Sequence, residues 1–182
     1  LGGLRTNGTT IIKAKKSRDH SELLLKYLRI PIVVKKQTNF DIIKIKGQKK
    51  FKSFNYIIPS DISSSAFFIV LTALSSESKI KIKNVNINPS RLGVIKILKI
   101  MGVKIIFKNI RKYKGEKIAD LYVKSAEYLK SINCPIKFNS SAIDEFLIIF
   151  LVAAKANGIS YFKGLSELNH KESPRLKWGA KI

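Results

Sequence analysis

A supersecondary pattern that occurs three times along the chain limits its possible folds more than any other feature. Each copy contains a β-rich run, a short polar link, and a helix opened by a serine and an arginine. These openings are Ser17-Arg18, Ser90-Arg91 and Ser173-Pro174-Arg175. The three arginines are 73 and 84 positions apart, so the period is similar but not constant. Such an internal repeat predicts several packed copies of one folding unit.

The spacing of apolar residues predicts the elements of each copy. The expected helices are 19–28, 63–74, 92–101 and 143–157. The expected strands are 9–13, 31–34, 41–46, 79–84, 103–107, 118–123 and 159–163, with the polar segment 109–116 as a hairpin link. The unit therefore has the order helix–strand–helix–strand–strand, which is typical of an α+β protein.

The serine–arginine pairs suggest anion binding, because the first turn of a helix has unpaired N–H groups and a positive dipole end. Three such helix starts would converge on one cleft if the copies pack around a common centre. Alternatively, Ser17, Ser90 and Ser173 are ordinary caps and the arginines are solvated. One copy alone favours capping, whereas three copies in register favour phosphate binding.

The charge and cysteine content narrow the function classes. The chain has 35 Lys+Arg against 12 Asp+Glu, a net charge of +23. This favours nucleic acid, a membrane surface or phosphorylated metabolites as partners, although an AT-rich genome would also enrich lysine. The single cysteine, Cys134, excludes an intramolecular disulfide and is expected in the core of a protein from a reducing compartment. The longest apolar runs, 66–71 and 146–154, are far shorter than the roughly 20 residues of a membrane-spanning helix.

Five motifs in order resemble those of EPSP synthases, the 3-phosphoshikimate 1-carboxyvinyltransferases. They are SRDHSE at 17–22, PSDISSSAFF at 59–68, NPSRLG at 88–93, AIDEF at 142–146 and ELNHKESPRL at 167–176. Together they extend over nearly the whole chain. The resemblance implies two domains, each an inside-out α/β barrel of three βαβαββ units, with the active site between them. Residues 1–58 would end the first domain and residues 59–182 would start the second, so we expect an incomplete fragment.

The resemblance also implies a reaction. The enolpyruvyl group of phosphoenolpyruvate would pass to the 5-hydroxyl of shikimate 3-phosphate through a tetrahedral intermediate that loses phosphate. The product, 5-enolpyruvylshikimate 3-phosphate, belongs to the shikimate pathway of aromatic amino acid biosynthesis. The family needs no metal and no organic cofactor. We expect a cytoplasmic enzyme that is a monomer at full length, with no nucleic-acid or membrane partner, and a fragment that is inactive alone.

Site residues follow by matching motifs. Asp144 corresponds to the family's candidate base for the reacting hydroxyl, and Glu172 to the glutamate that moves a proton at the methylene carbon. The corresponding alternatives are a first-turn carboxylate and a capping residue. Lys171 corresponds to a lysine that contacts shikimate 3-phosphate, and Arg175 to the arginine that binds the phosphoenolpyruvate carboxylate, where a planar fork fits.

Other motif residues have weaker functional interpretations. Ser17 and Arg18 correspond to positions near the phosphate of shikimate 3-phosphate, with a solvated cap as the alternative. Asp61 is expected to cap a helix near the domain crossing, and Arg91 to be structural. Glu145 is expected to pack or orient as readily as to take part in chemistry.

Four positions depart from the family pattern: Ser60, Leu147, Asn169 and Pro174. Proline fits the first turn of a helix, but the aspartate that it replaces would help to orient Arg175. Two other functions remain open from the sequence. UDP-N-acetylglucosamine enolpyruvyltransferase has the same fold and chemistry, although the SRDHSE and KESPR strings favour EPSP synthase. A basic nucleic-acid-binding module would explain the charge but lacks an aromatic-basic strand motif.

Overall fold

The computed structural model describes residues 1–48 and 50–180. The chain divides into two compact units, the first made of Leu1–Ile58 with Lys112–Glu116 and the second of Pro59–Arg111 with Lys117–Ile182. Lys112–Glu116 is the tip of a hairpin much later in the chain, and the sequence pattern does not indicate that it belongs to the first unit. The assignment of residues 1–58 and 59–182 to two enolpyruvyl-transferase domains stays a prediction.

The first unit is a small three-stranded sheet with one helix. After the 3-10 turn η1 (Gly2–Leu4), the chain forms β1 (Thr9–Lys15), α1 (His20–Tyr27), β2 (Ile32–Lys36) and β3 (Phe40–Lys46). The strand order is β1-β3-β2, and both pairings are antiparallel. Leu25 of α1 packs with Ile32 and Ile45 of the sheet to form the core of this unit.

The second unit repeats that arrangement and extends it. Its elements are α2 (Ile62–Leu74), β4 (Lys79–Asn86), η2 (Pro89–Arg91), α3 (Gly93–Ile100), β5 (Lys104–Tyr113) and β6 (Glu116–Lys124). The strand order β4-β6-β5 is the order of the first sheet, with α3 in the place of α1. The internal repeat predicted from the serine–arginine pairs is therefore a repeat of supersecondary structure.

A short parallel pairing completes the unit. Ser60 donates its N–H to Asn84 O (3.0 Å) and accepts from Asn86 N (2.9 Å), which places it parallel to β4. Because parallel neighbours require a crossover, α2 must return the chain across the sheet. Residues 60–124 therefore have the order βαβαββ, which confirms the predicted folding unit.

The third copy is present only in part. α4 (Phe146–Lys155) joins two segments that pair in parallel through the single bridges Lys130↔Asn157 and Asn133↔Tyr161. The 3-10 turns η3 (Ile136–Phe138) and η4 (Ser166–His170) and the short helix α5 (Arg175–Gly179) complete it. The strand predicted at 159–163 is reduced to the single bridge at Tyr161, because the partner segment turns into η3 soon after Asn133.

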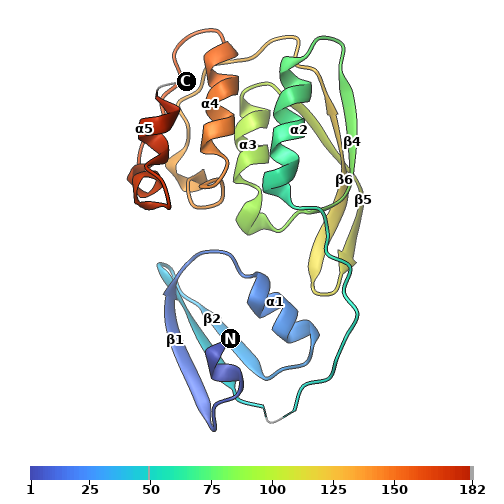
Figure 1. The fold of residues 1–182 in the computed structure, drawn as a ribbon, viewed down its shortest axis with the longest axis vertical. Helices are drawn as coiled ribbons and strands as arrows, with labels where there is room; N and C mark the ends of the chain where they lie inside the picture. Colours follow the sequence, from blue (N-terminus) through green and yellow to red (C-terminus); the bar gives the residue numbers. More distant parts are fainter. Residues whose placement is uncertain (49, 181–182) are drawn as a thin grey trace. The chain divides into compact units, whose positions relative to one another are not determined.

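Three helices pack together on one side of the second sheet, where α4 contacts α2 and α3. In Figure 1, α2, α3 and α4 lie side by side and all begin at the same end of the unit. The core between them and the sheet is aliphatic with one buried phenylalanine, and Ile69, Leu98 and Phe146 are fully enclosed. Burying each such side chain contributes about 1.5–3 kcal/mol. Cys134 lies in this core, as predicted, and burial raises the pKa of its thiol.

α2 and α4 are apolar on more faces than this core covers. Phe67 and Leu71 of α2 are 62% and 64% exposed, and Leu151 of α4 is 40% exposed. Helices that are apolar all round are normally enclosed on every side. Within residues 1–48 and 50–180, no helix has the length and hydropathy needed to cross a membrane.

An irregularity in β4 fixes the end of the sheet that leads into α2. The register of β4 against β6 shifts between Ile82 and Val85, and Asn84 takes a positive φ of 54°. Asp120 of β6 fills the bulge by accepting from Asn84 N (3.0 Å), Asn109 Nδ2 (2.9 Å) and Lys81 Nζ (3.1 Å). The segment 109–116, predicted as a hairpin link, is mostly strand, and the turn is confined to Lys114–Gly115.

The Asp120 carboxylate makes the bulge sensitive to acid. Hydrogen bonds from Asn109 first, and then from Asn84, lower the pKa of Asp120 from 3.8 to about 2. Because the folded pKa is below the unfolded one, this stabilisation is present above pH 4 and is lost as the pH falls through 2. We expect Asp120→Asn to lower the urea concentration at the unfolding midpoint relative to wild type at pH 6. This difference should shrink as the pH falls towards 2. An equal gap at both pH values would contradict this account.

Candidate active site

Three helix starts bring polar side chains together at one end of the second unit. Asp61 is the N-cap of α2, where its carboxylate accepts from Ser64 N (2.8 Å). Arg91 ends η2 just before α3, and Asp144 and Glu145 immediately precede α4. The βαβ crossovers explain this convergence, because they direct α2, α3 and α4 the same way (Figure 1). Asp61 therefore caps a helix, as the sequence indicated.

The inner part of this group is a buried network around Arg91. Its Nη2 donates to Asp61 Oδ1 (3.1 Å) and to Ser63 Oγ, and lies 3.9 Å from Glu145 Oε1. Ser63 Oγ in turn donates to Glu145 Oε1. The side chains of Arg91 and Glu145 are only 14% and 2% exposed. Such buried charges must be paired, so this network is a structural requirement of the three helix starts.

The structural role expected for Arg91 is therefore confirmed, whereas the alternative of an anion site at this helix start is not supported. Arg91 is directed into the protein, and Ser90 does not cap a helix. Asn88 holds this turn instead, accepting from both the N–H and the hydroxyl of Ser90 (2.8 Å each). Asp61 and Ser63 pair with Arg91 Nη2, and the Arg91 side chain is only 14% exposed.

The outer part of the group contains the predicted site residues of this unit. Asp144 Oδ1 accepts from Lys171 Nζ (3.3 Å) and lies 3.5 Å from Arg175 Nη1. Arg175 Nη2 also donates to Glu172 Oε2 (3.2 Å). Asp144, Lys171 and Arg175 are each about one quarter exposed, whereas the Glu172 side chain is 85% exposed. Four residues from two motifs, Asp144 in one and Lys171, Glu172 and Arg175 in the other, thus form one accessible cluster of two cations and two carboxylates.

The environment of Glu172 favours its ionised form. Its carboxylate accepts a hydrogen bond from its own backbone N–H and lies beside Arg175, and both effects lower the pKa of Glu172. Lys171 adds a smaller effect of the same sign. Glu172 is therefore a carboxylate at neutral pH and accepts a proton before it can donate one.

The Pro174 departure leaves Arg175 held by other residues. Proline occupies the N-cap position of α5 rather than its first turn, and Arg175 is the first helical residue. Arg175 bridges Asp144 and Glu172, so its orientation does not require an aspartate at position 174. Packing of Gly179 against Leu147 fixes α5 on α4.

Ser17 and Arg18 belong to the first unit. Both are exposed and directly precede Asp19, the N-cap of α1, which makes no side-chain capping bond. The following residue, His20, pairs through Nδ1 with Glu116 Oε1 (2.5 Å) within the same unit. In the part of the chain that the structure describes, no group of three His, Cys, Asp or Glu side chains is placed to hold a metal ion.

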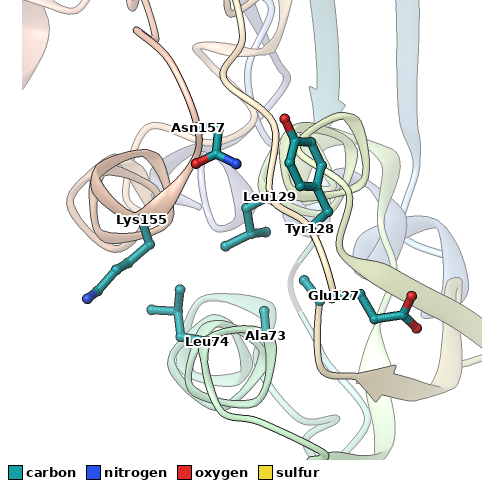
Figure 2. A pocket seen from close by; sticks show the side chains of 8 residues that line it. Ala73, Leu74, Glu127, Tyr128, Leu129, Lys155 and Asn157 are labelled. Carbon is teal, nitrogen blue, oxygen red and sulfur yellow. The ribbon is translucent and has the colours of Figure 1, made fainter.

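A pocket of about 290 Å³ lies at the other end of the helices (Figure 2). Ala73 and Leu74 line it from the end of α2, Lys155 and Asn157 from the end of α4, and residues 126–129 from the segment after β6. α2 has 13 residues, so its two ends are about 20 Å apart. Helix C-termini present carbonyl oxygens and the negative dipole end, which disfavours anions. The cluster around Asp144, rather than this pocket, is the candidate site.

Comparison with known proteins decides the family. The model of the EPSP synthase (3-phosphoshikimate 1-carboxyvinyltransferase) family matches residues 1–181. The chain belongs to the EPSP synthase family. It is 41% identical over 177 residues to the 3-phosphoshikimate 1-carboxyvinyltransferase of Zymomonas mobilis subsp. mobilis, covering 97% of this chain and 39% of that protein. The corresponding protein of Aquifex aeolicus is 36% identical over 178 residues, covering 97% and 41%.

Solved structures agree with the family assignment. EPSP synthase of Acinetobacter baumannii superimposes with a TM-score of 0.87 at 39% identity, covering 100% of this chain and 40% of that one. The predicted EPSP synthase-like fold, incomplete in this chain, is therefore confirmed. The chain spans about 40% of the length of the relatives that it matches.

Sequence reasoning missed the inner network of this EPSP synthase family member. It treated Arg91 and Glu145 separately, 54 positions apart, and gave Ser63 no partner. The motifs contained a partial signal, because Arg91 and Glu145 each stand at the start of an apolar helix. A charged side chain that becomes buried there needs an opposite charge beside it. Only the packing of α3 against α4 shows that they meet.

The outer cluster should bind anions more tightly when one carboxylate is removed. Its two cations and two carboxylates balance, so Asp144→Asn leaves one net positive charge. We expect this substitution in the complete protein to tighten inorganic phosphate binding severalfold at low salt, with the gain disappearing at high salt as charges are screened. Isothermal titration calorimetry measures it. Asp120→Asn, which removes a carboxylate elsewhere in the unit, should change nothing; unchanged binding in Asp144→Asn would contradict the charge balance.

Proposed function

We propose that the complete protein containing this chain transfers the enolpyruvyl group of phosphoenolpyruvate to the 5-hydroxyl of shikimate 3-phosphate. The observation that carries the proposal is the contact of Asp144 with both Lys171 and Arg175. These are the residues to which the EPSP synthase motifs assign a base and two anion-binding cations. Membership of the family and the names of the relatives support the same reaction.

In this reaction Asp144 takes the proton of the attacking hydroxyl. Lys171 donates to this carboxylate and holds it in position to accept the proton of the hydroxyl. Positive charge beside it stabilises the anionic intermediate as the hydroxyl oxygen bonds to C2 of phosphoenolpyruvate. Loss of phosphate from this intermediate then restores the double bond.

Glu172 handles the proton at the methylene carbon. That carbon gains a proton as the hydroxyl adds and loses one as phosphate leaves. The lowered pKa of Glu172 keeps it ionised, which is the form that the second step needs. For the first step, bound phosphate and carboxylate groups would raise that pKa, because like charges disfavour ionisation.

The two cations bind the substrates' anionic groups. Arg175 exchanges its contacts with Asp144 and Glu172 for the phosphoenolpyruvate carboxylate, which fits a guanidinium fork. Lys171 contacts shikimate 3-phosphate beside Asp144, and Ser17 and Arg18 of the first unit hold its phosphate. We propose a cytoplasmic monomer that needs no metal, cofactor or nucleic acid.

Replacing the acids should abolish turnover without unfolding the protein. We expect Glu172→Gln and Asp144→Asn to lower kcat by about 10²–10⁴-fold, the usual contribution of a positioned acid or base. Phosphate release from the two substrates measures this. The matched control is Glu127→Gln, since Glu127 is 86% exposed and pairs with Lys104 at 3.0 Å, much as Glu172 pairs with Arg175. Equal activity of Glu172→Gln and Glu127→Gln would rule out the assigned role.

The 182-residue chain alone should be inactive and poorly folded. It exposes the apolar faces of α2 and α4, and it spans about 40% of the relatives' length. We expect strong binding of the dye ANS and no phosphate release, with less dye bound by a Phe67→Ser, Leu71→Ser variant. Phosphate release at a rate near that of full-length relatives would overturn this expectation.

A further inference from the structure

The segment that leads to Asp144 is held at two points by the start of α3. One is the buried network in which Arg91 and Ser63 meet Glu145, the residue next to Asp144. The other is a close backbone contact at Gly93, whose N–H donates to Ser141 O (3.2 Å). From this geometry we propose that Arg91, Gly93 and Glu145 are positioning residues that set the place of the Asp144 carboxylate. The inference rests on the proposed function for its effect on turnover.

The contact at Gly93 leaves no room for a side chain. A Cβ at this position would lie 2.6 Å from Ser141 C and 2.7 Å from Ala142 N. Both are backbone atoms, so the clash cannot be relieved by turning a side chain. Any residue other than glycine must push the 141–142 backbone, and Asp144 follows two residues later.

The contact at Glu145 fixes the other side of Asp144. Glu145 N donates to Ala142 O (3.0 Å), and Glu145 O accepts from Ile149 N (3.0 Å), the first turn of α4. The Glu145 side chain is only 2% exposed, so its carboxylate depends on the hydroxyl of Ser63 and the nearby charge of Arg91 to offset its burial. Asp144 therefore lies between two anchored residues, Ala142 and Glu145, and its carboxylate is aimed at Lys171.

The adjacent acids Asp144 and Glu145 thus have different roles. Glu145 is enclosed and matched by Arg91 and Ser63, whereas Asp144 is about one quarter exposed and meets Lys171 and Arg175. Consecutive residues at a helix start point in directions about 100° apart, which separates the two carboxylates. The enclosed acid holds the exposed one in place.

The test uses the complete protein with four substitutions. Glu145→Gln and Gly93→Ala should lower kcat about a hundredfold, as a misplacement of about 1 Å does, while each substrate's KM changes less than about threefold. The controls are Asp120→Asn, another buried carboxylate of this unit, and Gly158→Ala, a strained glycine (φ +92°) at the far end of α4. They should lower the unfolding midpoint and leave kcat unchanged.

Losses of kcat no greater than those of the controls would overturn the positioning role while the proposed function stands. If Glu145→Gln does not fold, Ser63→Ala removes one hydroxyl of the network and should lower kcat about tenfold through the same displacement. Wild-type protein that releases no phosphate would refute the proposed function instead. In that event a crystal structure of Gly93→Ala decides the inference: Asp144 beyond hydrogen-bonding reach of Lys171 supports it, and an unmoved Asp144 overturns it.

Discussion

A buried guanidinium organises the end of the second unit that holds the candidate site. Arg91 cannot be taken out of water unless carboxylates and hydroxyls come with it, and Asp61, Ser63 and Glu145 supply them from two other helix starts. Buried ion networks add little net stability over apolar packing, but they penalise every arrangement in which one member is left alone. The network therefore specifies how the starts of α2, α3 and α4 meet, and the accessible cluster around Asp144 depends on that meeting.

Chain topology makes this meeting possible. Ser60 with β4, and the bridged segments on both sides of α4, are parallel neighbours that need a crossover helix. Crossover connections between parallel strands have the same handedness, so successive helices run in the same direction. Their N-terminal ends therefore lie at one end of the unit. Anions suit that end, because helix N-termini present backbone N–H groups and positive dipole ends. The pocket at the opposite end, between the C-termini of α2 and α4, has the wrong polarity for them.

The errors of sequence reasoning have physical causes. Apolar and aromatic residues predict a strand at 159–163, but a strand exists only where a partner ladder continues, and the partner segment turns into η3 soon after Asn133. The polar residues of segment 109–116 predict a link, yet cross-strand pairing extends the hairpin almost to its tip. Lysines and asparagine are tolerated there because that face of the hairpin is solvated. Ser90 looked like a helix cap, but the neighbouring Asn88 accepts both of its donors.

Consecutive residues were enough to indicate the repeat, the helix–strand–helix–strand–strand order, the starts of α1 and α2, and the membership of Asp144, Lys171, Glu172 and Arg175 in one family pattern. These follow from local propensity, apolar spacing and ordered motifs, all of which are contained in consecutive residues. Tertiary structure alone decided that Arg91 faces inward and meets Glu145, that Gly93 presses on the backbone before Asp144, and that Arg175 joins Asp144 to Glu172. Each of these depends on distances between residues far apart in the chain, which are fixed only when the helices pack and buried charges find partners.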